Sequence, residues 1–545
     1  MFKNKKKTLG TKRSSSKNGF LFGAAKESAV TVSGNNAKKY SSTGNSWVDQ
    51  FGKLGEYKAP RSFDAIARDC SILFAEDAEM FVKFTVYMRM ISRKTHIIGA
   101  NRKTQDAQSG AELKHESIMR MLWLAVNDSD LFWKNIVVFL SAGSCKDIFV
   151  MLRTDLVYHG WDERVLDWNK MGNLILSLLE DSNTVDLVKK YLPQIRAKSQ
   201  LKTVEAEANC VIAKWLCNKL FGINSYRQYR KLKTSGTAHE WQQLISRQQF
   251  DRIDFKQIHG RALNLLVRSK FLKNQGLSDK YTGWVDKQDT VKYTGFAHEV
   301  LCELDFTNDT NMCKTIDKQF MELVQKAKDG EQPCDLIVVR DTSGSMGSTA
   351  SGTKYSSNAI AKSLAMYFSE FLDGVFKNHW IEFNDNAVMH QWRGSTPTQK
   401  WRNDRSCAYG STNFQSVINL FCKLKNDGVT ESDFPSGILC ISDGEFNPSQ
   451  LGKTNVETAR RKLQRAGFSR DYVDNFKIVL WNIPNSFYGG RSGTKFETFG
   501  DVRNVFYMSG YSGSNVKFLM NGKVETAADL FYAAMDQELL NLVEK

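Results

Sequence analysis

The sequence has 545 residues, of which 41% are hydrophobic and 25% charged, so we expect a globular protein with two to four domains. Its 10 cysteines are scattered without a C-x-x-C pair, which argues against disulfide scaffolds and zinc ribbons and predicts reduced thiols. There is no run of about 18 apolar residues and no apolar segment after the basic N-terminus, so we expect neither a membrane span nor a secretory leader.

The net charge of +16 is concentrated in the first part of the chain. Residues 1–50 carry a net charge of +8 and residues 51–300 about +10, whereas residues 301–545 carry about −2. This asymmetry predicts a polyanionic partner for the N-terminal part, most often nucleic acid. The alternative, solvated helix faces plus a basic tail, stays open.

The first 332 residues separate into a tail and a helical region. Residues 1–45 are rich in Lys, Ser, Gly and Asn and predict a basic flexible tail. Residues 46–332 show apolar residues at spacings of three and four, as in two helices that begin near Phe63 and Ala78. Successive short helices without strands predict an α-helical solenoid with degenerate, HEAT-like repeats, or a curved bundle.

Residues 333–545 predict a different architecture. Short β-rich runs such as LIVVR, WIEF, GILCIS and KIVLWN alternate with amphipathic helices, and a last helix is expected over ETAADLFYAAMDQELLNLVE. This alternation predicts a doubly wound, mostly parallel, Rossmann-like sheet with helices on both faces. In such sheets ligands bind at the loops that follow the carboxyl ends of the strands.

Oxygen-bearing side chains occur on three of these loops. Asp341, Ser343 and Ser345 follow the first strand, Thr412 precedes a helix, and Asp443 follows a buried strand. Carboxylates and hydroxyls gathered at one point suit a hard divalent cation, Mg²⁺ first and Mn²⁺ or Ca²⁺ next. Five protein oxygens leave one octahedral position open, which an acidic side chain of a protein partner can complete.

These segments, DTSGSM, GSTN and SDGE, resemble the metal-ion-dependent adhesion site of a von Willebrand factor A domain. The resemblance covers about 333–545 and assigns the metal-ligand roles to the five residues just named. One departure is Arg340, which stands where the family usually has an apolar or small residue. A cation there would weaken metal binding or pair with Asp341 instead.

A helical N-terminal half joined to an A domain resembles the Ro autoantigen, or TROVE, architecture. The resemblance is stronger to an uncharacterised TROVE-like family of phages and plants, through FVKFTVYMRMI, SAGSCKDIFVML, YRQYRKL and VFYMSGYSGSNVKFLM. It implies a ribonucleoprotein component that binds single-stranded or small structured RNA through helical repeats, located in the cytoplasm or within a viral particle.

One basic and aromatic segment is a candidate RNA contact. The candidate residues, at 226–233, are Tyr226, Arg227, Tyr229, Arg230, Lys231 and Lys233. Aromatic rings can stack on bases and cations can hold phosphates. Because helical spacing puts the two tyrosines on one face, core packing is the alternative for them.

We expect no enzyme activity, because no nucleophile, general base and orienting group come together in any stretch. The segment Gly347–Tyr355 resembles the sequence motif of a phosphate-binding loop, but it contains G-T-K where that motif has G-K-[ST]. The first hypothesis is therefore a non-catalytic RNA-binding scaffold whose A domain recruits a partner through a cation. The alternatives are a structural or assembly protein, such as a viral particle component, and an A-domain adaptor for an ATPase or nuclease.

Overall fold

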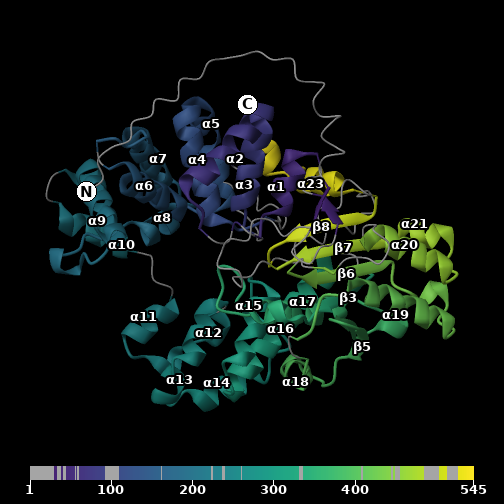
Figure 1. The fold of residues 1–545 in the computed structure, drawn as a ribbon. Helices are drawn as coiled ribbons and strands as arrows, with labels where there is room; N and C mark the ends of the chain where they lie inside the picture. Colours follow the sequence, from purple (N-terminus) through teal and green to yellow (C-terminus); the bar gives the residue numbers. More distant parts are fainter. Residues whose placement is uncertain are drawn as a thin grey trace.

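The structure is a computed structural model (Figure 1). It describes residues 30–32, 38–40, 44–55, 57, 60–91, 110–160, 162–222, 225–235, 240–258, 260–330, 335–406, 409–443, 446–447, 455–483, 503–511 and 526–545. Two short strands, β1 (Val30–Val32) and β2 (Lys38–Tyr40), pair antiparallel within the segment predicted to be a flexible tail. The rest of that segment up to residue 43 lies outside the described residues.

Helices make up the N-terminal region, as predicted. They are α1 (Ser46–Gly52), α2 (Phe63–Glu76), α3 (Ala78–Arg89), α4 (Lys114–Asn127), α5 (Ser129–Ala142), α6 (Lys146–His159), α7 (Trp168–Glu180), α8 (Val185–Tyr191), α9 (Val204–Phe221), α10 (Tyr226–Thr234), α11 (Glu240–Ser246), α12 (Arg261–Arg268), α13 (Phe271–Asn274), α14 (Ser278–Val285), α15 (Ala297–Leu301) and α16 (Thr310–Gly330). Asp77 separates α2 from α3, because its side chain accepts the Met80 N–H at 2.9 Å and so caps the second helix.

The C-terminal region contains the predicted sheet. Its strands are β3 (Leu336–Asp341), β4 (His379–Phe383), β5 (Ala387–Gln391), β6 (Gly437–Ser442), β7 (Lys477–Asn482) and β8 (Val505–Ser509). The spatial order is β5-β4-β3-β6-β7-β8, and all neighbouring strands are parallel except β4 and β5. The chain is therefore of the α+β class, with a helical region followed by a mostly parallel sheet.

Helices cover both faces of the sheet. They are α17 (Ser357–Ser369), α18 (Pro397–Asn403), α19 (Phe414–Asn426), α20 (Asn455–Arg465), α21 (Arg470–Asn475) and α23 (Ala527–Met535). The side chains of Ile337 and Val339 pack in one core with α19 and α20, and those of Leu336 and Val338 pack in the other core with α17 and α23. This alternation follows from the two-residue period of a strand.

The helices form an arc that meets the sheet region at both ends (Figure 1). At one end α1 contacts α23 and β8, and at the other α15 and α16 contact α17 and α18. The core on the α17 face of the sheet continues into the helical region without a break. The two predicted domains thus share one hydrophobic core, which the sequence did not indicate.

The last predicted helix is shorter than expected. It ends at Met535, and a 3-10 turn, Leu540–Leu542, follows it. Leu539 and Leu540 are fully buried, and the Asn135 side chain of α5 accepts the Glu544 N–H at 2.8 Å. Tertiary contacts with the helical region therefore override the local helical periodicity here. Among the described helices, none combines the length and the apolar character that a membrane crossing requires.

Candidate cation site and nucleic-acid surface

The carboxyl end of β3 carries the predicted triplet of oxygen ligands. β3 is buried along its whole length because it lies between β4 and β6 and has helices on both faces. The chain leaves the strand at Asp341, which is fully buried and accepts the Ser343 N–H at 2.7 Å through Oδ1. Ser343 Oγ lies 3.3 Å from Ser345 Oγ. The three side chains therefore belong to one tight turn at the edge of the sheet.

β6 brings a second carboxylate to this edge. The parallel register sets Ile441 opposite Arg340, so Ser442 comes next to Asp341. Ser442 Oγ donates a hydrogen bond to Asp341 Oδ2 at 2.5 Å, and Asp443, only 9% exposed, is the next residue. Ser442 is a residue of this site that the sequence analysis did not identify. Its position just before Asp443, at the end of a buried strand, could have indicated it once β6 was known to neighbour β3.

The two carboxylates interact electrostatically. Burial raises the pKa of Asp341, and the negative charge of Asp443 raises it further, to about 7 from an ordinary value of 3.8. Ionised Asp341 is therefore costly at this position unless a positive charge is bound nearby. A divalent cation held by the two carboxylates would offset that cost, so the arrangement fits the predicted ion.

A loop carrying Thr412 lies against the same turn. The Tyr409 N–H donates to the Thr342 carbonyl at 2.8 Å, and the Gly344 N–H donates to the Gly410 carbonyl at 3.3 Å. Thr412 itself is 3% exposed. The backbone of the Thr412 loop is thus tied to the backbone of the Asp341 turn, which brings together the three loops that sequence analysis singled out.

Most of the candidate metal ligands at the carboxyl edge of the sheet are hydroxyl groups. Within the ranges that the structure describes, no group of three or more His, Cys, Asp or Glu side chains is placed to hold a metal. The candidate site has two carboxylates, and its other predicted ligands are the hydroxyls of Ser343, Ser345 and Thr412. Such an all-oxygen set suits Mg²⁺, Mn²⁺ or Ca²⁺ rather than a softer transition metal.

Arg340 points away from the candidate cation site. Because adjacent strand residues face opposite sides of the sheet, its side chain lies on the α17 face while that of Asp341 does not. Arg340 Nη1 forms an ion pair with Asp404 Oδ2 at 2.7 Å, and Nε and Nη2 donate to Asn358 Oδ1 at 3.1 and 2.7 Å. The side chain of Arg340 therefore pairs with Asp404 and not with Asp341.

The predicted RNA-contacting residues of α10 fall into two groups. The side chains of Arg227, Arg230 and Lys231 are exposed, and no described acidic side chain forms an ion pair with them. Tyr226 is half-buried and packs against the core. The exposed residues thus form a basic surface on α10 that a polyanion can reach.

Tyr229, by contrast, is buried, and Lys233 is half-buried with its ammonium bonded to backbone carbonyls. The Tyr229 ring is 1% exposed, and its hydroxyl donates to the Pro193 carbonyl at 3.0 Å. Burial lowers the pKa of Lys233, whose ammonium donates to the carbonyls of Lys190 at 3.3 Å and Leu192 at 2.5 Å. For Tyr229 the core-packing alternative holds, because a ring with so little exposed surface cannot stack on a base.

Comparison with known families gives one match. Residues 335–542 match the model of a domain of unknown function (DUF7788). The match covers the sheet from β3 to the final 3-10 turn and includes all five predicted metal ligands, but less than half of the chain. None of the curated proteins matches this sequence.

Proposed function

We propose that this protein is a non-catalytic RNA-binding scaffold of the Ro/TROVE type, with a helical, HEAT-like region that binds RNA and a von Willebrand A-like sheet region that binds a protein partner. In this proposal a divalent cation at the edge of the sheet binds an acidic side chain of the protein partner. The observation that carries the proposal is the pair of buried, electrostatically coupled carboxylates at the carboxyl ends of two neighbouring parallel strands, Asp341 as the last residue of β3 and Asp443 directly after β6.

Two features support the RNA-binding half of the proposal. The excess of positive charge lies within the first 300 residues, and the helical region carries exposed cations such as Arg227 and Arg230. The alternative of a viral assembly protein depends on the basic tail, and residues 1–29 of that tail lie outside the described residues.

The cation half is tested by calorimetric titration of the full chain with Mg²⁺ or Mn²⁺. We expect saturable binding, and Asp341→Asn should weaken it at least about tenfold, or about 1.4 kcal/mol, because one of two charged ligands is lost. Asp471→Asn, an exposed carboxylate on α21, is the matched control and should bind as the wild type does. Equal affinity in both variants, or no saturable binding by the wild type, would refute the cation site.

The RNA half is tested by fluorescence anisotropy with a labelled single-stranded RNA of about twelve nucleotides, a length suited to sites of this class. We expect binding whose affinity falls linearly with salt on logarithmic axes, because phosphate contacts release counterions. A full-length protein that shows no salt-dependent binding would rule out the RNA-binding function.

A further inference from the structure

A pocket of about 310 Å³ lies where α6, the end of α8 and the start of α9 meet. This volume is near the lower end of the range for small-ligand sites, about 300–1,000 Å³. One face of α6 lines it, because Lys146, Phe149, Val150 and Arg153 follow helical spacing. Its opposite side comes from the segment 191–196 and from α9.

The charge of this pocket is positive. Lys146, Arg153 and Arg196 line it, and none of them forms an ion pair with a described acidic side chain. The one acidic residue in the lining is Glu205, an exposed side chain at the start of α9. Its pKa is lowered by hydrogen bonds to the backbone and to Thr203, and then by the charge of Arg153. Three cations against one acid leave a surplus that favours an anionic ligand.

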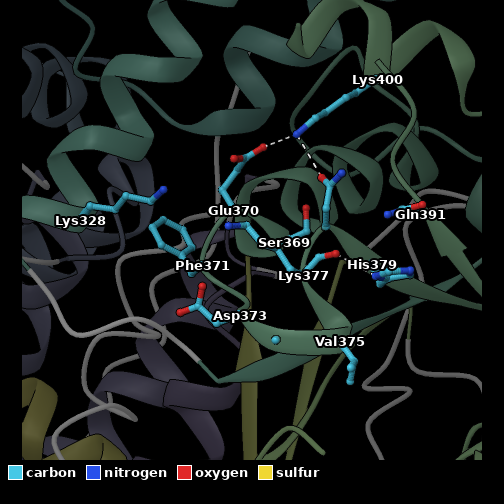
Figure 2. Close-up of a pocket in the computed structure, with 12 residues that line it drawn as sticks. Lys328, Ser369, Glu370, Phe371, Asp373, Val375, Lys377, His379, Gln391 and Lys400 are labelled. Carbon is cyan, nitrogen blue, oxygen red and sulfur yellow. Dashed lines mark hydrogen bonds and ion pairs between the residues drawn. The ribbon is translucent and has the colours of Figure 1, made fainter. Parts of the chain in front are cut away.

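A larger hollow among the described residues has a smaller surplus of positive charge. The hollow of about 960 Å³ beside α17 is shown in Figure 2. There Lys400 points to Glu370 at 2.6 Å and to Asn378 Oδ1 at 3.1 Å, and Asp373 adds a second carboxylate. Two acids thus face three lysines in that hollow, with Lys328 and Lys377 beside Lys400, which leaves a surplus of one positive charge against two in the pocket at α6.

The pocket at α6 also offers groups that suit a nucleobase. The ring of Tyr191 is half-buried in its wall, with Lys146 Nζ 5.8 Å from the ring centroid. The amides of Gln194 and Asn209 line the same space. An aromatic ring can stack on an unpaired base, amides can hydrogen-bond its edge, and arginines can hold the neighbouring phosphates.

The wall of this pocket is fixed from behind by α10. Tyr229 binds the Pro193 carbonyl and Lys233 binds the carbonyls of Lys190 and Leu192, so both side chains hold the segment that includes Tyr191. Tyr229 and Lys233, which the sequence predicts to contact RNA directly, therefore support the backbone of the pocket wall.

From this geometry we propose that the pocket between α6, α8 and α9 binds one unpaired nucleotide of a single-stranded RNA. The base lies against Tyr191, and its phosphates face Arg153 and Arg196. This inference rests on the proposed RNA-binding function and assigns a binding site for part of the RNA.

The test measures, by fluorescence anisotropy with the labelled single-stranded RNA, the affinity of the full-length wild type and that of the full-length double variant Arg153→Ala/Arg196→Ala. We expect the double variant to bind at least about tenfold more weakly and its salt slope to fall by about two, since two phosphate contacts are removed. The control is Arg461→Ala/Arg465→Ala, which removes the same charge from an exposed face of α20 and should change the affinity little. Circular dichroism melting checks that both variants fold.

A second readout uses RNA containing 4-thiouridine, cross-linked by light and mapped by mass spectrometry. We expect the cross-link in the peptide that contains Tyr191. If wild-type protein binds RNA while the two double variants behave alike, or if the cross-link maps only to α10, the pocket inference is wrong and the RNA-binding function stands. If the wild type binds no RNA, both are wrong.

Discussion

At the scale of single residues, the pairing of Arg340 with Asp404 leaves Asp341 available to a cation. Arg340 is 1% exposed, and its guanidinium lies 5.0 Å from the ring centroid of Trp380. Burial alone would raise the pKa of Asp404, but the charges of Arg340 and Lys362 outweigh that effect and lower it to about 2. Arg340 and Asp404 thus form a buried ion pair on the α17 face of the sheet, in which each charge neutralises the other.

This pairing predicts a pH-dependent loss of stability. Because the pKa of Asp404 is depressed in the folded state, its contribution to the free energy of unfolding is full above about pH 4 and is lost as the pH falls toward about 2. Asp404→Asn should cost about 3 kcal/mol at neutral pH, since it leaves Arg340 buried with no carboxylate. Urea unfolding followed by tryptophan fluorescence measures the difference between wild type and variant.

The difference should shrink steadily over that acidic range. Asp471→Asn serves again as the exposed control and should differ little from the wild type at any pH. A difference that stays constant from neutral to acidic pH would show that the stabilisation does not come from the ionised Asp404.

At the scale of elements, the loop before α19 decides where Thr412 lies. Gly410 in this loop has φ of +77°, a conformation that favours glycine. A Cβ there would lie 2.8 Å from Asp385 Oδ2, and Asp385 in turn accepts hydrogen bonds from the N–H and Oγ of Ser411. The backbone conformation of Gly410 and the side-chain contacts with Asp385, just after β4, thus hold the loop in place.

We expect Gly410→Ala to weaken cation binding as well as the fold. The left-handed conformation should cost about 1–2 kcal/mol, and the contact with Asp385 should displace the loop and with it Thr412. Titration calorimetry and urea unfolding measure the two effects.

Gly428→Ala, just after α19, provides the comparison. Gly428 has φ of +100°, and a Cβ there would meet nothing within 4 Å. That variant should lose stability from backbone strain and keep its cation affinity. Equal cation affinity in both variants would show that the position of the Thr412 loop does not matter for binding.

At the scale of the whole molecule, the helical arc and the sheet are joined by a cluster of aromatic rings. Phe531 of α23 is fully buried, and its ring centroid lies 6.1 Å from that of Trp47, 5.7 Å from that of Phe51 and 5.7 Å from that of Phe84. These rings come from α23, α1 and α3. We therefore expect the sheet and the first helices to unfold together.

Phe531→Ala should lower the free energy of unfolding by about 3–5 kcal/mol through the cavity that it leaves. Hydrogen exchange with mass spectrometry should show that α3 and α17 lose protection together. Tyr532→Ala changes the next residue, which is 48% exposed, and should cost much less. Loss of protection confined to the sheet region would contradict a shared core.

Much of the fold and part of the candidate site follow from the sequence by itself. The apolar run ending at Asp341 predicts a buried strand, and spacings of two or of three to four residues predict strands and helices, because burial on one face imposes these periods locally. The same local logic places Ser343 and Ser345 on the turn after the strand. Length and charge distribution also separate a basic helical region from a nearly neutral sheet region.

Only the tertiary structure decided which of these pieces meet. Ser442 reaches Asp341 across 101 residues of sequence because β6 is the neighbour of β3, and local periodicity does not encode strand order. Likewise, no local pattern states that Arg340 pairs with Asp404 or that Tyr229 reaches Pro193, because each depends on packing between distant segments. The pocket at α6 was missed for the same reason: its cations are far apart in the chain and gather only when α6, α8 and α9 pack.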